Sequence, residues 1–158
     1  MIPGKIIRFL NRANVGHAGT RDRNLVPHGH GVSGWAVGPD GQTFTVFVPA
    51  GAREHLIESL EDNGQISITI EEYPEHEAYQ VKGRYVRHRP TLQEDVDTAE
   101  RIRERFVKAV LPLAGEVAVQ ALHAFVQQPV LAIDIDVREI YVQTPGPGAG
   151  ARLFPREE

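Results

Sequence analysis

The chain has 158 residues, of which 41% are apolar and 24% charged, and its net charge is −4. This is the composition of an ordinary globular protein of one domain, and it excludes collagen-like, low-complexity and coiled-coil chains. The acidic balance argues against a protein whose main task is to bind nucleic acid. The absence of cysteine excludes thiol nucleophiles, disulfides, iron–sulfur clusters and thiolate zinc sites.

No stretch reaches the roughly 18 apolar residues that a membrane-spanning helix needs. The N-terminal residues also lack the apolar core and the small-residue cleavage site of a signal peptide. We therefore expect a cytoplasmic protein without a membrane partner, and the lack of cysteine fits a reducing compartment.

The first third of the chain predicts a helix followed by a β-hairpin. Pro3 and the apolar residues after it recur at helical spacing, so a helix is expected to end before Gly16. Residues 20–27 are polar and typical of a turn, and residues 28–37 form a glycine-rich stretch typical of a strand. A turn sequence then leads to residues 43–48, which are β-branched and aromatic, so these two strands should pair.

The middle of the chain predicts a short helix with Leu56 and Leu60 on its apolar face, ended by Asn63-Gly64. Alternating apolar residues over 66–70 and 79–85 predict two half-buried strands. Two helices, separated at Pro112, are expected over about residues 91–127.

The last strand is predicted from residue 131, and its apolar phase slips after Arg138, which indicates a β-bulge at about 138–139. The tail over 144–158 is rich in proline and glycine and is predicted to be irregular. Short turns between strands favour an antiparallel sheet, and few uncovered edges favour a small barrel. The expected fold is mainly β (α+β), in one domain that spans residues 1–158.

Residues 29–34 match the pattern G-x-G-x-x-G. A dinucleotide-binding fingerprint requires a strand before it and a helix after it, whereas here a turn precedes and a strand follows, so we reject that interpretation. The glycines are instead expected to let a backbone, a flat ligand or a partner subunit approach closely. On a strand, His28 and His30 would share one face. No metal-ligand spacing completes that pair, so we predict no metal site; the alternatives are the polar lining of a pocket or of a strand edge, or a donor to a phosphate.

No residue is an obvious catalytic acid, base or nucleophile. There is no G-x-S-x-G motif, and Asp134 and Asp136 are best explained as charges on the wet face of a strand. The basic helix over residues 101–108 contains interspersed glutamates, so a solvated face is expected there. Gln80 and Lys82 are different, because they place an amide and a cation side by side. They would either bind the edge of a heterocycle and a negative charge or form a sheet face open to water.

Several segments, in their order and spacing, resemble the pyridoxamine 5′-phosphate oxidase-like FMN-binding split barrels. The matching segments are Thr20-Arg21-Asp22 with Leu25 and Pro27, residues 45–49, residues 62–68, and Tyr79-Gln80-Val81-Lys82-Gly83. The tail over residues 143–150, QTPGPGAG, resembles the C-terminal signature of one small subgroup.

The resemblance implies a six-stranded antiparallel split barrel with flanking helices. It also implies a homodimer with two FMN sites built across the subunit interface. In the family, basic side chains on the second strand and at the turn into the inserted helix hold the FMN phosphate. The positions that correspond here, with the candidates for the isoalloxazine ring added last, are His30, Val32, Pro49, Arg53, His55, Gln80 and Lys82.

The sequence departs from the true oxidases at two places. His30 replaces the usual arginine of the second strand, and the Ser-Arg-Lys of the turn is missing, which argues against oxidation of pyridoxamine phosphate itself. We therefore expect an FMN-binding oxidoreductase that acts on another small molecule. The alternative is a non-catalytic split-barrel module that sequesters flavin or binds haem, with His28, His30 or His123 as the axial ligand.

Overall fold

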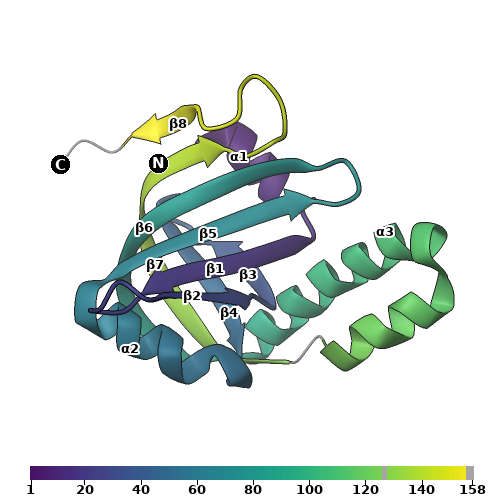
Figure 1. Cartoon of the computed structure of the whole chain (residues 1–158), viewed down its shortest axis with the longest axis horizontal. Coiled ribbons are helices and arrows are strands. Elements are labelled where there is room, and N and C mark those ends of the chain that lie inside the picture. Colours follow the sequence, from purple (N-terminus) through teal and green to yellow (C-terminus); the bar gives the residue numbers. More distant parts are fainter. Residues whose placement is uncertain (126–127, 156–158) are drawn as a thin grey trace.

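The structure is a computed structural model that describes residues 1–125 and 128–155, apart from the side chains of residues 53, 121–125 and 155. It consists of three α-helices, one short 3-10 helix and eight strands in the described residues (Figure 1). In chain order these are α1 (Gly4–Leu10), β1 (Val15–Arg21), β2 (Pro27–Gly31), β3 (Gly34–Val37), β4 (Thr43–Pro49), η1 (Ala50–Ala52), α2 (Arg53–Asn63), β5 (Gln65–Glu72), β6 (Glu77–Pro90), α3 (Gln93–Phe125), β7 (Pro129–Val142) and β8 (Arg152–Pro155).

All eight strands belong to one curled sheet in the order β2-β1-β5-β6-β7-β4-β3, with β8 added beside β7. Every pairing is antiparallel, as the short connections predict. The two ends of the sheet are joined by the chain itself, which passes from β2 to β3 through Val32 and Ser33. The predicted antiparallel split barrel is therefore confirmed, although it has eight strands in place of six.

The predicted single strand over residues 28–37 is divided because the chain changes its pairing partner. The N–H of Val32 donates to Gly16 O at 3.0 Å, on the β1 side, and the N–H of Ser33 donates to Phe47 O at 2.8 Å, on the β4 side. β2 thus ends where the chain leaves β1, and β3 begins where it joins β4. This change of partner closes one side of the barrel.

Strand β1 was not predicted. Gly16, Ala18 and Thr20 are turned toward the interior and are small or polar, so the alternation that reveals a half-buried strand is weak. The small size of Gly16 is required, because a Cβ on it would lie 2.8 Å from both Trp35 and Val32. The large side chains of the opposite strands fill the space that β1 leaves.

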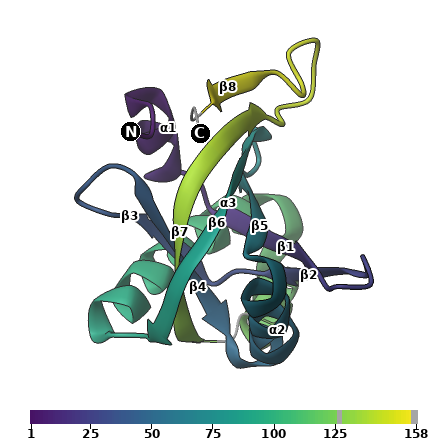
Figure 2. The ribbon, with the colours of Figure 1, turned by 90° about the vertical axis from the view of Figure 1, so that its left-hand side faces the viewer.

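The core lies inside the curled sheet and is closed at its two ends by helices (Figure 2). At one end α1 inserts Phe9, whose ring packs edge-on against Tyr79 with centroids 4.7 Å apart. At the other end α2 buries Leu56 and Leu60. Helix α2 ends at Gly64, which has the left-handed φ of 67° that the sequence predicts for this position.

Helix α3 was expected to break at Pro112, and this is wrong. Pro112 lies inside the helix, and the backbone leaves helical geometry at Gly115, with φ 75° and ψ 177°. Such a positive φ suits glycine because it has no Cβ. The two parts of α3 fold back on one another beside the barrel (Figure 1). Residues 126–127, the end of the predicted helical region, lie outside the described residues. No described helix is long and apolar enough to cross a membrane.

The β-bulge predicted at residues 138–139 is confirmed. Lys82 of β6 pairs with Glu139, whereas the next residue, Gly83, pairs with Val137, so Arg138 is the extra residue. The predicted tail is confirmed as irregular only in part. Residues 144–150 contain no helix or strand, but Arg152–Pro155 form β8, because Phe154 packs against the core and the strand pairs with β7. Residues 156–158 lie outside the described part of the chain.

Candidate functional site

Three histidines come together where β2 meets the first turn of α2. His28 and His30 alternate with Gly29 and Gly31 along β2, so both imidazoles project from one face of the strand. His55 reaches them from α2, and its ring lies parallel to that of His28, with centroids 5.3 Å apart and 4° between the planes. The sequence predicted that His28 and His30 share one face of a strand. The contact with His55 depends on how α2 packs, so the sequence did not predict it.

His30 is the most enclosed of the three imidazoles. Its backbone pairs with Ala18, a fully buried residue of β1. Burial lowers the pKa of His30 below its usual 6.5, and the neighbouring His28 and His55 lower that pKa further. The ring is therefore neutral at pH 7, and it can donate one N–H and accept at its other nitrogen.

Unpartnered polar atoms occur on β1, β2 and α2. Among the described side chains, four have a buried nitrogen or oxygen atom without a hydrogen-bond partner. Three of these atoms are Thr20 Oγ1 on β1, His30 Nε2 on β2 and Ser59 Oγ on α2. A buried polar atom that lacks a partner costs on the order of 1–3 kcal/mol. A polar ligand or an ordered water that hydrogen-bonded to one of these atoms would therefore stabilise the protein.

The start of α2 lies in this region and has no side-chain cap. Its N-cap residue is Ala52, which has no side chain to bond the first N–H groups of the helix. Arg53 is the first helical residue, and Pro49 ends β4 just before the 3-10 turn. Uncapped N–H groups and an arginine at a helix start are a favourable setting for an anion.

The outer mouth of the histidine cluster is acidic. A hollow of about 870 Å³ is lined by Asp22, Arg23, Asn24, His28, His55, Glu58, Ser59, Glu61 and Asp62. His55 Nδ1 lies 4.0 Å from a carboxylate oxygen of Glu58, and the His55 side chain is 65% exposed. Carboxylates here oppose a phosphate at His55, so an anion in this region is better placed toward His30 and the start of α2.

Gln80 and Lys82 lie elsewhere. Both project from the outer face of β6, where Gln80 Nε2 is 3.5 Å from Thr69 Oγ1 and Lys82 Nζ is 4.7 Å from the centroid of the Tyr141 ring. Between β2 and β6 stand β1 and β5. Within one chain, the structure therefore separates these two residues from His30.

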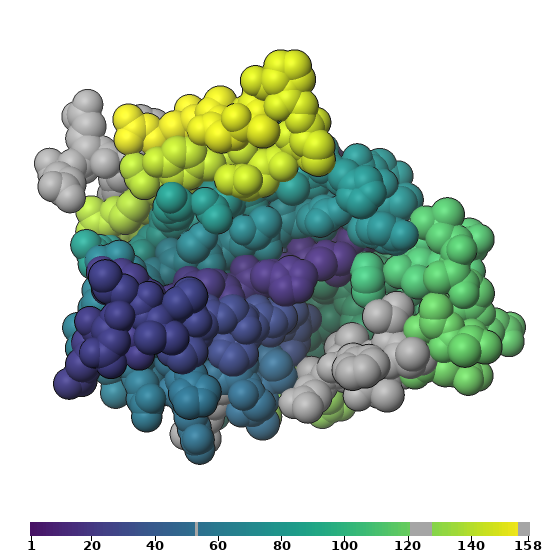
Figure 3. All heavy atoms as spheres, viewed as in Figure 1, coloured from purple at the N-terminus to yellow at the C-terminus, as the bar shows by residue number. Residues whose placement is uncertain are grey.

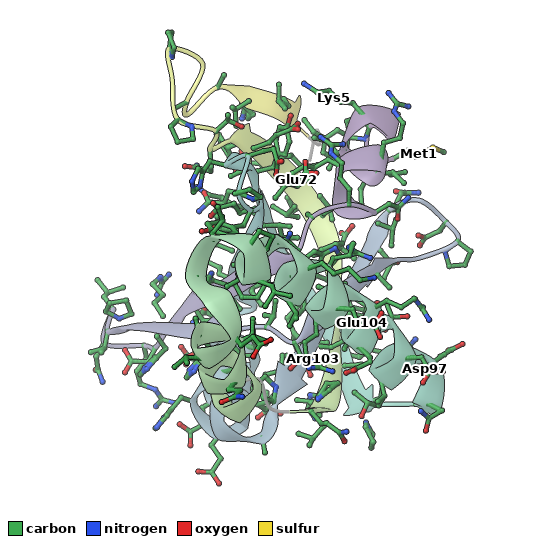
Figure 4. The ribbon with its side chains drawn as sticks, turned by 90° about the vertical axis from the view of Figure 1, so that its right-hand side faces the viewer. Met1, Lys5, Glu72, Asp97, Arg103 and Glu104 are labelled. Atoms are coloured by element: carbon green, nitrogen blue, oxygen red, sulfur yellow. The ribbon has the colours of Figure 1, made fainter. Side chains whose placement is uncertain are left out.

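Val32 and the basic helix over residues 101–108 have structural roles that explain them without a ligand. Val32 packs against the core beside Gly16 and Trp35, and its N–H donates to Gly16 O, so neither its side chain nor its N–H is available to a ligand. The basic helix over residues 101–108 has the solvated face expected of it. Asp97, Arg103 and Glu104 lie on the outer surface of α3 (Figure 4), and Arg103 pairs with Glu100. The side chain of His123 lies outside the described residues.

The fold is similar to that of several solved proteins. The chain aligns with HupZ of Group A Streptococcus at 17% identity and a TM-score of 0.58, over 96% of this chain and 99% of that one. It aligns with an F420 reductase at 14% identity and a TM-score of 0.54, over 88% and 98%. A putative pyridoxamine 5′-phosphate oxidase from Lactobacillus delbrueckii follows at 12% identity and a TM-score of 0.53, over 89% and 93%.

No family model and no curated protein matches the sequence. The likeness to these structures nevertheless shows the fold. It is the split barrel of the pyridoxamine 5′-phosphate oxidase-like proteins, as the sequence resemblance implied.

Proposed function

We propose that the chain is a homodimeric flavoprotein that binds FMN without a covalent bond and transfers hydride or electrons to or from a small molecule in the cytoplasm. The observation that carries this proposal is His30 Nε2. It is a buried imidazole nitrogen without a described partner, on the strand where the family holds its cofactor phosphate. Structures of the same fold include proteins named as an F420 reductase and as a putative pyridoxamine 5′-phosphate oxidase, which supports a flavin-type ligand.

The phosphate end of FMN would lie against His30, the N–H groups at the start of α2, and Arg53. The FMN phosphate, with a second pKa near 6, carries most of two negative charges at pH 7. Those donors together supply hydrogen bonds and one fixed positive charge. Because Glu58 stands beside His55, we place His55 at the edge of this site, where its ring holds His28 in position.

Gln80 and Lys82 would meet the ring end of the flavin. They lie on the opposite face of the sheet from His30, so a homodimer that shares each FMN between two copies would bring both groups to one ligand. Lys82 would stabilise negative charge at the ring, and Gln80 would hydrogen-bond its edge. FMN supplies the redox chemistry when it is bound, and the chain binds and orients it.

The test begins with the purified protein and added FMN. We expect flavin absorbance that is retained on gel filtration of a dimer and released as FMN on heating. His30→Ala should weaken FMN binding at least tenfold, whereas His17→Ala, on the exposed face of β1, should not change it. Failure of the wild-type protein to take up FMN would overturn the proposal, and a haem-type absorbance band would support the binding-module alternative. Bleaching of bound flavin by NAD(P)H would distinguish an enzyme from a module that only sequesters flavin.

A further inference from the structure

The outer face of the sheet carries a second hollow, which we call the outer groove. It has a volume of about 910 Å³, and it runs across β1, β5, β6, β7 and β8 on the side of the molecule seen in Figure 3. Its lining residues are Gly19, Thr20, Arg21, Gln65, Ile66, Ser67, Lys82, Gly83, Arg84, Arg138, Glu139 and Arg152. This size is at the upper end of the range for small-molecule sites, about 300–1,000 Å³.

The outer groove is strongly basic in a chain whose net charge is −4. Its described lining contains five basic residues and one acidic residue, Glu139. The hollow beside the histidine cluster, on the other side of the β1–β2 hairpin, contains four carboxylates instead. Opposite charges are thus separated onto two sides of one hairpin, and the field of the outer groove attracts anions.

Several of these cations have no carboxylate partner within the protein. Among the described residues, Arg21, Lys82 and Arg84 form no ion pair. Arg84 Nη1 donates to the neutral carbonyl of Asn63 at 3.0 Å, and Lys82 rests on the Tyr141 ring. By contrast, Arg152 lies 3.1 Å from Glu139. Three positive charges are therefore available to an external anion.

Arg138 adds a buried donor to the same groove. As the bulge residue, it projects beside Glu139, next to Lys82 of β6. Its Nη2 lies 3.1 Å from Asp136, while its Nε is buried and has no hydrogen-bond partner in the described part of the chain. This Nε is the fourth of the unpartnered buried polar atoms, and Thr20, which carries another of them, also lines the outer groove.

The floor between the cations is neutral and flat. Gly19 of β1 pairs with Ser67 of β5, and Ser67 pairs with Lys82 of β6. A glycine and a serine therefore lie on the floor of the groove beside the cations of β6. A Cβ on Gly19 would come no closer than 3.9 Å to any atom. With neighbouring strands about 4.8 Å apart, a ligand that lies across β1, β5 and β6 would span about 10 Å between Arg21 and the pair Lys82 and Arg84.

We propose that the outer groove binds a phosphorylated small molecule that carries at least two negative charges, with its phosphate held by Arg84 and Arg138. Arg21 contacts a second anionic or polar group across the floor of the groove. Guanidinium groups bind phosphate oxygens in pairs, which explains the predominance of arginine. The residues that hold this phosphate differ from those proposed for FMN, whose phosphate is placed at His30 on the other side of the sheet and whose ring is placed at Gln80 and Lys82.

The test measures the binding of inorganic tripolyphosphate and of ADP to the full chain by calorimetry, and maps both ligands by amide NMR shifts. We expect shifts at Gly19, Ser67 and Gly83. Arg84→Gln with Arg138→Gln should weaken binding of both ligands at least tenfold. The matched control, Arg23→Gln with Lys108→Gln, removes the same charge from the acidic hollow and from α3, and it should change binding less than twofold.

Three results would overturn the inference. The first is equal affinity of the groove variant and the control. The second is displacement of tripolyphosphate by one equivalent of FMN with shifts confined to the histidine cluster, which would make the FMN phosphate site the only anion site. The third is binding of a heparin fragment or a single-stranded RNA without measurable binding of ADP, which would assign the groove to a macromolecule. Since tripolyphosphate binding is measured without flavin, failure of FMN to bind leaves this result intact.

Discussion

The imidazole of His28 lies flat against that of His55, with 4° between the ring planes and 5.3 Å between their centroids. One ring comes from a strand and the other from a helix 27 residues later in the sequence. Their positive charges, when present, act on His30, whose pKa they lower. The contact therefore links the packing of α2 to the charge of the most enclosed histidine.

Stability should decline in mildly acidic solution because of this cluster. The pKa of His30 is lower in the folded chain than the ordinary 6.5, first because of burial and then because of His28 and His55. Well above pH 6.5 the imidazole is neutral in both states and has no effect; as the pH falls toward and below 6.5, the unfolded chain binds the proton more readily. We expect the free energy of unfolding, from urea titrations, to fall between pH 7.5 and pH 5.5. The fall should be smaller in His30→Gln, and an identical fall in both proteins would contradict this account.

Binding of FMN should be accompanied by proton uptake. A phosphate at His30 favours the charged imidazole, so the pKa of His30 rises on binding. We expect calorimetry at pH 6.5, in two buffers of different ionisation enthalpy, to show more protons taken up by the wild type than by His30→Gln. His17→Gln provides the control, because His17 is exposed on β1. Equal uptake in all three proteins would remove His30 from the phosphate site.

Gly83 should tolerate no side chain. A Cβ at this position would lie 2.4 Å from Cγ2 of Ile135 and 2.6 Å from the backbone oxygen of Asp136. Gly83→Ala must therefore displace β7, and we expect it to lower the free energy of unfolding by about 1–3 kcal/mol. Gly29→Ala is the control, since nothing lies within 4 Å of its Cβ, and its effect should be under about 1 kcal/mol. Chemical denaturation of the two variants makes the comparison, and equal losses would argue against the close approach of β6 to β7.

Asp95 should stabilise the start of α3. Its carboxylate receives two hydrogen bonds from Arg89, at 2.5 and 3.2 Å, and one from the N–H of Leu92 at 2.7 Å. Burial raises the pKa of Asp95, but these bonds more than offset that effect, so the pKa is lower than the usual 3.8. We expect Asp95→Asn to cost about 1–3 kcal/mol at pH 7, because Arg89 loses its partner.

Asp97→Asn is the matched control for this pair, because Asp97 is on the same helix and its hydrogen bond comes from exposed Gln93. Asp95 in the folded state is charged down to a lower pH than in the unfolded state. Its contribution is therefore complete above pH 3.8 and is lost as the pH falls through the lowered pKa. Thermal unfolding at pH 7 and pH 3 measures the difference in stability between Asp95→Asn and Asp97→Asn. We expect this difference to be smaller at pH 3. A difference that does not change would contradict the assignment.

The sequence predicted the elements that have strong local signals. Gly64 ends α2 because its left-handed φ suits glycine, and the slip of apolar phase at Arg138 reports the bulge directly. Strand β1 carries no such signal, because its inward residues are Gly16, Ala18 and Thr20. The division of residues 28–37 into β2 and β3 also left no trace in the sequence, since it depends on which strand pairs with Val32 and Ser33.

The sequence likewise predicted one part of the candidate sites and could not predict another. His28 and His30 could be paired from their spacing, because a strand has a fixed period of two. The outer groove could not be predicted, because Arg21, Lys82 and Arg138 belong to three strands whose register is a property of the folded sheet. Lys82 was singled out from sequence, but its basic neighbours lie up to 70 positions away.

Because Arg138 is an extra residue, the alternation of inward and outward side chains along β7 changes phase at this point. Up to Val137 the strand follows one alternation, and from Ile140 it follows the other, so both ends keep their apolar side chains inside while Arg138 and Glu139 line the groove together. Deletion of this single residue would restore regular pairing with Ile140 still inside, whereas regular pairing with Arg138 retained would turn Ile140 outward. Substitutions of Arg138 and Glu139 would therefore change the charge of the outer groove and leave the residues that fill the barrel unchanged.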